Sequence, residues 1–323
     1  MRWISYPMKL SPAYVAYPWG GENLGPLYGR DLPGDHMGES WELSAEGKGI
    51  STVANGPFAG QTLQQLWRAF AEPLAGRSQP GAGGAFPLLI KLIDAADDLS
   101  VQVHPDDAYA AAHERDRGGR GKTEMWVVLR AEPGARMVLG LQPGVDRARL
   151  AAALGNGAVG DCLYSAPVRA GEAYFIPAGL VHAIGRGIVV YEVQQNCDIT
   201  YRLFDYNRPG LDGKPRPLHI SQSLDAAHYD LPPARPAQGE RTRQEGACVE
   251  RLSVNAYFEL SRIELDGEAS LDTQGRLCAL TVTQGAVQVG EVEARPGDTV
   301  LLPGSLPGAR LSGQGALLSA CAR

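Results

Sequence analysis

The sequence predicts a mainly β protein with a few short helices, in which the strands form two jelly-roll barrels. Forty glycines and 23 prolines among 323 residues provide the many turns that short strands require. In the segment 171–182, a glycine opens a tight turn, and a proline six residues later ends a short β-rich run. The segment 297–308 repeats this glycine-to-proline spacing, which indicates a second barrel.

The first part of the chain is expected to contain strands and two helices. A helix is predicted after the N-cap Thr62, because apolar residues recur at helical spacing up to Phe70. The other expected elements are strands around Trp19 and Trp41 within residues 1–60, a glycine-rich loop at 78–85, two strands within 86–104 joined by the acidic turn 94–98, and a short helix within 106–117.

The rest of the chain is expected to be richer in strands. We expect a short helix at 145–154, a β-rich stretch at 162–206 and an irregular loop at 208–216. Residues 229–246 are rich in Pro, Arg, Gln and Glu, which is typical of a linker. The predicted division is a catalytic N-terminal domain, a linker and a smaller C-terminal domain, at residues 1–230, 231–246 and 247–323.

The repeated segment lacks residues that could bind a metal. Ser305 stands at the position of the second glycine of the first segment, and Gly308 stands at the position of its histidine. We interpret the C-terminal domain as a barrel that has lost its ligands. A coincidental strand-turn pattern is the alternative.

Composition argues against several classes of function. The net charge of -6 provides no basic footprint for nucleic acid. The chain has no 18-residue apolar run for a transmembrane helix, and its first residues lack the apolar core of a signal peptide. The five cysteines are scattered and odd in number, so we expect reduced thiols in the cytoplasm. A monomer or homodimer is expected.

Three segments offer side chains for one metal ion. Strand alternation places Gln102 and His104 on one face, and Glu124 lies in a second expected strand. The turn after Pro177 directs His182 into the barrel. This mixed nitrogen and oxygen set suits zinc or another borderline divalent metal. Each residue alone also fits a structural role, but their combination favours a metal site.

The segment Gly171–His182 is the second sequence motif of the cupin β-barrel, and the first 220 or so residues resemble type I mannose-6-phosphate isomerases of the shorter bacterial form. The matching stretches are Trp19–Gly21, Gly38–Ser44, Phe86–Lys91, Leu99–Asp107, Gly121–Trp126, Gly171–His182 and Asp198–Arg202. The helical insertion of larger members, between Glu124 and His182, is short here.

The resemblance implies a metal-dependent isomerase that interconverts mannose 6-phosphate and fructose 6-phosphate through a cis-enediol. It also implies one Zn²⁺ per chain, held by the four candidate ligands. The pair Asp198 and Arg202 matches the active-site Asp-x-x-x-Arg of the family.

Polar and apolar residues alternate from Glu192 to Arg202, which predicts one continuous strand with a polar face. That face could meet solvent or line a pocket, and the resemblance favours a pocket. Arg202 would stabilise the enediolate or hold the phosphate, because its charge is fixed. Asp198 would orient Arg202 or the substrate.

Three further residues are candidates for the active site. Lys122 could carry the proton, because a nearby zinc ion and Arg202 would favour its neutral form. A zinc-bound water is the alternative base. Lys91 and Ser100 could contact the phosphate, although Lys91 would fit an exposed position on a sheet equally well.

Two other classes of function compete with the isomerase. Two histidines and a carboxylate could form the facial triad of an iron-dependent cupin oxygenase. A non-catalytic cupin could bind sugar phosphates without turnover. The cluster of Lys122, Asp198 and Arg202 favours an anionic sugar substrate, and the complete ligand set argues against a binding protein.

Overall fold

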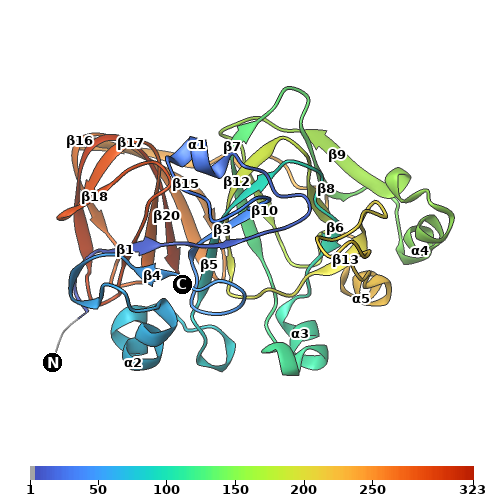
Figure 1. Ribbon diagram of the computed structural model, residues 1–323, viewed down its shortest axis with the longest axis horizontal. Coiled ribbons are helices and arrows are strands. Elements are labelled where there is room, and N and C mark those ends of the chain that lie inside the picture. Colours follow the sequence, from blue (N-terminus) through green and yellow to red (C-terminus); the bar gives the residue numbers. More distant parts are fainter. Residues whose placement is uncertain (1–3) are drawn as a thin grey trace.

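The strands dominate the computed structural model, which describes residues 4–323 and contains five α-helices (Figure 1). The strands form three antiparallel sheets of nine, six and five strands. The mainly β fold class with few helices is thereby confirmed. No helix within residues 4–323 has the length and apolar character needed to cross a membrane.

The nine-stranded sheet joins the two ends of the chain. Its order is β14-β15-β16-β20-β17-β19-β1-β4, with β18 paired to β17. The strands are β1 (Met8–Ser11), β4 (Thr52–Val53), β14 (Glu240–Gln244), β15 (Ala247–Val254), β16 (Phe258–Asp272), β17 (Cys278–Val289), β18 (Val292–Ala294), β19 (Thr299–Leu302) and β20 (Gly308–Ala322). Figure 1 shows these orange and red C-terminal strands beside the blue strands β1 and β4.

The other two sheets contain the predicted site residues. The six-stranded sheet has the order β10-β7-β12-β5-β3-β2, and the five-stranded sheet has the order β13-β6-β11-β8-β9. Their strands are β2 (Ala13–Val15), β3 (Glu39–Leu43), β5 (Leu88–Ala95), β6 (Val101–Val103), β7 (Glu124–Ala131), β8 (Arg136–Leu141), β9 (Leu163–Pro167), β10 (Ala173–Ile176), β11 (His182–Ile184), β12 (Ile188–Gln195) and β13 (Tyr201–Phe204).

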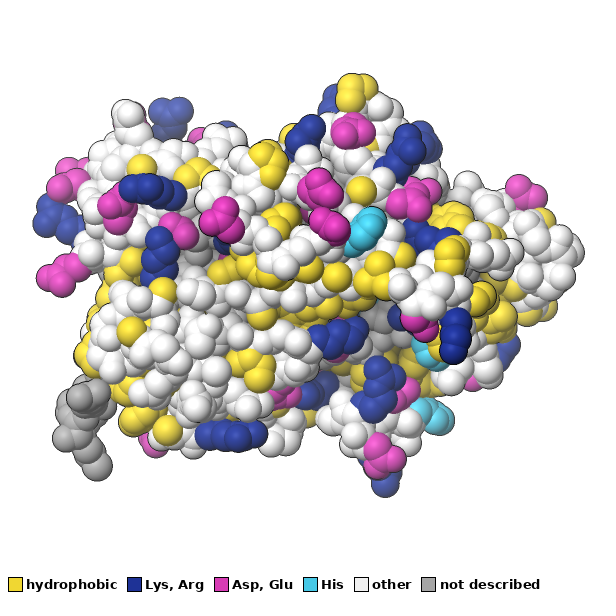
Figure 2. Space-filling model, in the orientation of Figure 1, with side chains coloured by type: hydrophobic (Ala, Val, Ile, Leu, Met, Phe, Trp, Pro, Cys, Tyr) yellow, Lys and Arg dark blue, Asp and Glu magenta, His cyan; other side chains and the backbone are white. Residues whose placement is uncertain are grey.

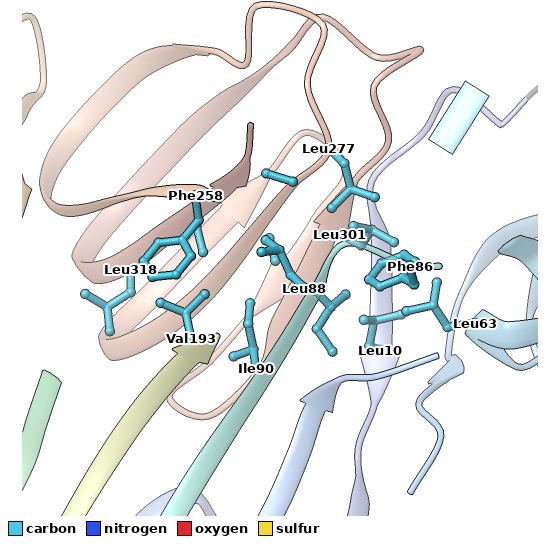
Figure 3. Packing of buried hydrophobic residues seen from close by; sticks show 14 of the residues in the cluster. Leu10, Leu63, Phe86, Leu88, Ile90, Val193, Phe258, Leu277, Leu301 and Leu318 are labelled. Carbon is cyan, nitrogen blue, oxygen red and sulfur yellow. The ribbon is translucent and has the colours of Figure 1, made fainter. Parts of the chain in front are cut away.

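Hydrophobic side chains fill both faces of the six-stranded sheet. On one face, Trp126 and Ile93 belong to a buried cluster with Leu139 of the five-stranded sheet. On the other face, Ile90 packs in a second cluster with Phe258 of the nine-stranded sheet (Figure 3). Where these clusters exclude water, polar side chains on the sheet need partners within the protein.

The helices lie outside the sheets. They are α1 (Leu24–Tyr28), α2 (Leu63–Ala75), α3 (Asp107–His113), α4 (Arg147–Asn156) and α5 (Ile220–Ala226), with short 3-10 turns at Gly56–Phe58, Ala82–Gly84, Arg115–Arg117 and Val159–Cys162. The Thr62 hydroxyl accepts from the Gln65 backbone N–H, and the Gln65 side chain accepts from the Thr62 N–H. The N-cap prediction is therefore confirmed by a complete capping box.

The motif residues turn the chain as predicted. Gly171 and Gly179 have φ angles of 91° and 84°, in the region that favours glycine, and β10 lies between them. Gly297 also has a φ of 91° and precedes β19. The turn-strand pattern thus occurs in both segments.

Two predicted boundaries differ from the structure. Part of the predicted linker forms β14, an edge strand paired with β15. The predicted continuous strand from Glu192 to Arg202 is wrong, because β12 ends at Gln195 and β13 begins at Tyr201. The Gln194 side-chain amide donates to the Cys197 carbonyl at 2.6 Å, which stabilises a bend instead of a ladder.

The expectation of reduced thiols is wrong for two cysteines. Cys278 on β17 and Cys321 on β20 form a disulfide, because the sheet register places them directly opposite with Cα atoms 4.0 Å apart. Their separation of 43 residues gave no local signal. Cys162, Cys197 and Cys248 are free thiols.

Candidate active site

A cavity of about 320 Å³ lies between the six- and five-stranded sheets. The sequence-predicted residues that line it are Lys91, Ser100, Gln102, Lys122, Asp198 and Arg202. A larger cavity of about 480 Å³ opens near Tyr206, but none of the predicted site residues lines it. The smaller cavity is therefore the candidate active site.

Strand pairing explains how distant segments meet at this cavity. In the five-stranded sheet, Gln102 pairs with Arg202 on one side and with His182 on the other. In the six-stranded sheet, Lys91 pairs with Glu192. Directly paired residues share a face of a sheet, so each sheet presents a row of polar side chains to the space between them.

The predicted ligands His104, Glu124 and His182 form a buried cluster whose ligand atoms lie within 4.8 Å of one another. The Glu124 carboxylate oxygens lie 3.6 Å from His104 Nε2 and 3.4 Å from His182 Nε2. Three elements from separate parts of the sequence thus converge on one point.

The hydrogen bonds of the two imidazoles leave their Nε2 atoms available for a metal. His104 Nδ1 lies 2.9 Å from the Ile199 carbonyl oxygen, and His182 Nδ1 lies 2.8 Å from the Leu180 carbonyl oxygen. A carbonyl oxygen only accepts, so each Nδ1 carries the hydrogen and each Nε2 carries a lone pair. His182 Nε2 has no partner within the described chain, whereas His104 Nε2 lies 3.1 Å from Lys122 Nζ. This tautomer is the one that binding of a metal through Nε2 needs.

The protonation of these groups also fits a metal. Burial lowers the pKa of His182 to about 4, and burial with the Lys122 cation holds the pKa of His104 well below its usual value. Burial and the Glu192 carboxylate raise the pKa of Glu124, which alone disfavours the ionised form that a metal needs, while the Lys122 cation acts in the opposite direction. His182 Nε2 and Glu124 Oε1 are buried without hydrogen-bond partners among the described residues. A divalent cation would satisfy both atoms, so the residues present fit the group.

Lys122 lies directly beside this cluster. Its Nζ is 2.8 Å from Glu124 Oε2 and 3.1 Å from His104 Nε2. Burial lowers the pKa of Lys122, but the Glu124 and Glu192 carboxylates raise it more, so the net shift is upward. The protein groups alone therefore favour the charged form of Lys122. This direction is opposite to the neutral form that we expected from a nearby metal ion and Arg202.

Lys91 is buried, so the alternative of an exposed sheet position is wrong. Its Nζ lies 3.4 Å from Glu39 Oε2 and 3.6 Å from Glu192 Oε1, and 4.8 Å from the centre of the Trp41 ring. The Trp126 indole N–H donates to Glu192 at 2.9 Å. This network fixes two carboxylates at the wall of the cavity.

Arg202 and Asp198 both line the cavity, but they do not form an ion pair among residues 4–323. Asp198 Oδ2 lies 3.3 Å from Lys48 Nζ instead. Arg202 donates from Nη1 to the Pro217 carbonyl at 3.1 Å, while its Nε is buried and unpaired within the described chain.

Several lining residues were not singled out from the sequence. They are Tyr17, Trp19, Glu39, Lys48, Arg117, Arg216 and His219. Glu39 and Trp19 lie within stretches of the family resemblance, which offered a signal. Lys48, Arg216 and His219 come from turns and loops, where no periodicity indicates which way a side chain faces.

The cavity carries an excess of positive charge. Six basic side chains line it, against three carboxylates: Lys48, Lys91, Lys122, Arg117, Arg202 and Arg216, against Glu39, Glu192 and Asp198. The chain as a whole has a net charge of -6, and the face shown in Figure 2 mixes both signs without one large patch. A cavity of this kind attracts a small anion.

Comparisons with known proteins agree with this site. Residues 8–128 match the family Phosphomannose isomerase type I, catalytic domain. The mannose-6-phosphate isomerase of Streptococcus mutans is 35% identical over 308 residues, 94% of each chain. The mannose-6-phosphate isomerase ManA of Bacillus subtilis is 35% identical over 311 residues, 95% of this chain and 96% of the relative.

The fold is likewise shared with a solved structure. The crystal structure of the mannose 6-phosphate isomerase from Bacillus subtilis matches with a TM-score of 0.89 at 31% identity, over 97% of this chain and 99% of that chain. Fold, site and relatives together define this protein as an isomerase. The chain belongs to the type I mannose-6-phosphate isomerase family.

Proposed function

We propose that this protein interconverts mannose 6-phosphate and fructose 6-phosphate in the cavity between the six- and five-stranded sheets. The observation that carries the proposal is the buried cluster of His104, Glu124 and His182 beside a cavity with an excess of basic side chains. The relatives named above are mannose-6-phosphate isomerases, and a basic cavity suits a sugar phosphate.

The metal in this proposal is Zn²⁺, held by His104, Glu124 and His182 with Gln102 as a fourth ligand. Support for Gln102 comes from its register, because it pairs directly with His182. Two neutral imidazoles, an amide and one carboxylate leave a net positive charge on a divalent ion. When bound, the ion would supply Lewis-acid stabilisation of negative charge on a substrate oxygen.

The isomerisation moves two protons, one between carbons and one between oxygens, and needs no oxidant. A proton leaves C2 of the aldose and returns to C1, while the O2 hydroxyl loses a proton and O1 gains one. We assign the C2-to-C1 transfer to Lys122 Nζ, which must be neutral to accept the proton. Its place beside the metal cluster supports this role, because a cation there favours the neutral amine.

The remaining predicted residues bind and orient the substrate in this proposal. The Arg202 guanidinium stabilises the enediolate, because its charge does not titrate near neutral pH. Asp198 orients the substrate through its carboxylate, which lines the cavity and pairs with Lys48. Ser100 and Lys91 supply further polar contacts, and both line the cavity.

We further propose that residues 247–323 form a metal-free cupin-like barrel after the linker. The equal φ angles of Gly171 and Gly297 support a repeated unit. Gly308 at the position of His182 offers no ligand side chain. A single catalytic site per chain follows, in a protein that we expect in the cytoplasm.

The test is formation of fructose 6-phosphate from mannose 6-phosphate by the purified protein, followed with a coupled assay. We expect activity that is lost on chelation and restored by Zn²⁺. Absence of turnover in every metal state would refute the isomerase. Bound iron in such a sample would favour the oxygenase, and retained sugar-phosphate binding would favour a binding protein.

A further inference from the structure

Arg216 lies at the cavity because Asp205 holds it there. Asp205 is only 4% exposed, and it accepts hydrogen bonds from Arg216 Nε and Nη2, both at 2.7 Å. These bonds use one edge of the guanidinium and leave Nη1 for another partner. Arg216 is thus a preorganised donor at the cavity wall.

Asp205 does not need Arg216 for its own neutralisation. Arg208 Nη2 already donates to the same carboxylate at 2.9 Å, and Arg208 does not line the cavity. Arg208 Nη1 also donates to the exposed Asp97 carboxylate at 3.1 Å, so the two guanidinium groups are balanced by two carboxylates. Arg216 differs from Arg208 because it lines the cavity and keeps its Nη1 for a ligand there.

The loop between Asp205 and Arg216 has a defined shape. Tyr206 and Asn207 have φ angles of 56° and 52°, in a region that residues other than glycine adopt only at an energetic cost. The chain then returns through a bridge between Pro209 and Pro215. This path brings Arg216 back to Asp205, eleven residues after it.

Two further donors lie beside Arg216. Burial and the Arg216 cation lower the pKa of Arg202, which places two like charges close together. His219 Nδ1 accepts from the Arg202 backbone N–H at 3.2 Å, so the neutral ring carries its hydrogen on Nε2. Burial and Arg202 lower the pKa of His219, which keeps the ring neutral. An anion would relieve the repulsion between the guanidinium groups.

We propose that Arg216, together with His219 Nε2–H, binds the phosphate group of the substrate, and that Asp205 is the positioning residue for Arg216. The planar fork of a guanidinium matches phosphate oxygens. The assignment rests on the proposed function, since a sugar phosphate is the substrate there. It makes the loop after β13 the element that distinguishes phosphorylated from free sugars.

Binding measured by calorimetry on the metal-loaded protein tests the assignment, with the equilibrium mixture of mannose 6-phosphate and fructose 6-phosphate as the ligand so that no net turnover occurs. Arg216→Ala should raise the dissociation constant for mannose 6-phosphate about 10- to 100-fold, the loss of a charged hydrogen bond. Its affinity for unphosphorylated mannose should not change. The matched control is Lys214→Ala, which removes the same charge from an exposed position of the same loop.

Steady-state kinetics separate positioning from folding. Asp205→Asn should raise KM with little change in kcat, and Arg216→Lys should recover part of the lost affinity. Melting curves confirm that each variant is folded. Equal losses in Lys214→Ala and Arg216→Ala, or normal mannose 6-phosphate affinity in Arg216→Ala, would overturn the assignment. If the wild type neither binds nor converts mannose 6-phosphate, the proposed function itself fails.

Discussion

Lys91 on β5 and Glu192 on β12 lie directly opposite each other, and each residue is only 3% exposed. The Lys91 ammonium lies between the Glu192 and Glu39 carboxylates. Burial lowers the pKa of Lys91, but the two carboxylates raise it more, so its pKa lies well above the usual value. The charges of this buried network depend on one another.

Lys91→Met should destabilise the protein by about 3–5 kcal/mol, because it leaves two buried carboxylates without their cation. Urea denaturation gives the free energy of unfolding. The control is Lys9→Met, whose partly exposed pair with Asp298 should contribute at most about 1 kcal/mol. Equal effects of the two substitutions would show that the Lys91 network does not stabilise the fold.

Glu124→Gln should lose the metal, because it removes the single carboxylate of the cluster. Metal content after dialysis, measured by plasma mass spectrometry, should fall from about one ion per chain to a small fraction. Glu46→Gln, at a carboxylate that pairs with Arg120 instead, should retain the metal. Stoichiometric zinc in the Glu124 variant would remove this residue from the ligand set.

Arg202→Ala should reduce kcat at least about 10²-fold, the usual cost of removing one group that stabilises charge in a transition state. Its metal content should stay intact, because Arg202 does not contact the metal cluster in the described hydrogen bonds and ion pairs. Arg186→Ala, at an exposed arginine outside the cavity, serves as the control. Near-normal turnover in Arg202→Ala would exclude it from catalysis.

Loss of the disulfide should lower stability without changing the active site. Cys321→Ser should reduce the free energy of unfolding by about 2–4 kcal/mol, since the bond closes a long loop. A reducing agent should lower the melting temperature of the wild type and have no such effect on the variant. Cys248→Ser, at a free thiol, should match the wild type. Unchanged melting of the wild type on complete reduction would contradict this expectation.

The sequence was sufficient to predict the residues that strand alternation places on one face. His104, Glu124 and His182 lie in one buried cluster, as their strand and turn patterns predicted, and Gln102 pairs with His182 in the five-stranded sheet. The fold class followed from the same patterns.

Other features depend on contacts that no local pattern contains. The disulfide requires the register between β17 and β20, which the whole sheet determines. Arg216 reaches the cavity only through its bonds to Asp205, and loops have no period from which such contacts could be read. The break after Gln195 is accompanied by two hydrogen bonds from the Gln194 side-chain amide, to the Gln195 and Cys197 carbonyls, which no alternation of residues predicts.

The place of β1 has a consequence for the order of events during biosynthesis. β1 pairs with β19, so Met8 lies opposite Leu301. β4 can cover one edge of β1 early, but a ribosome releases β1 almost 300 residues before β19 exists, so the other edge keeps unpaired backbone groups until translation is nearly complete. Truncation before β19 would thus leave that edge without its neighbour, and we expect nascent chains of this protein to need protection from aggregation until then.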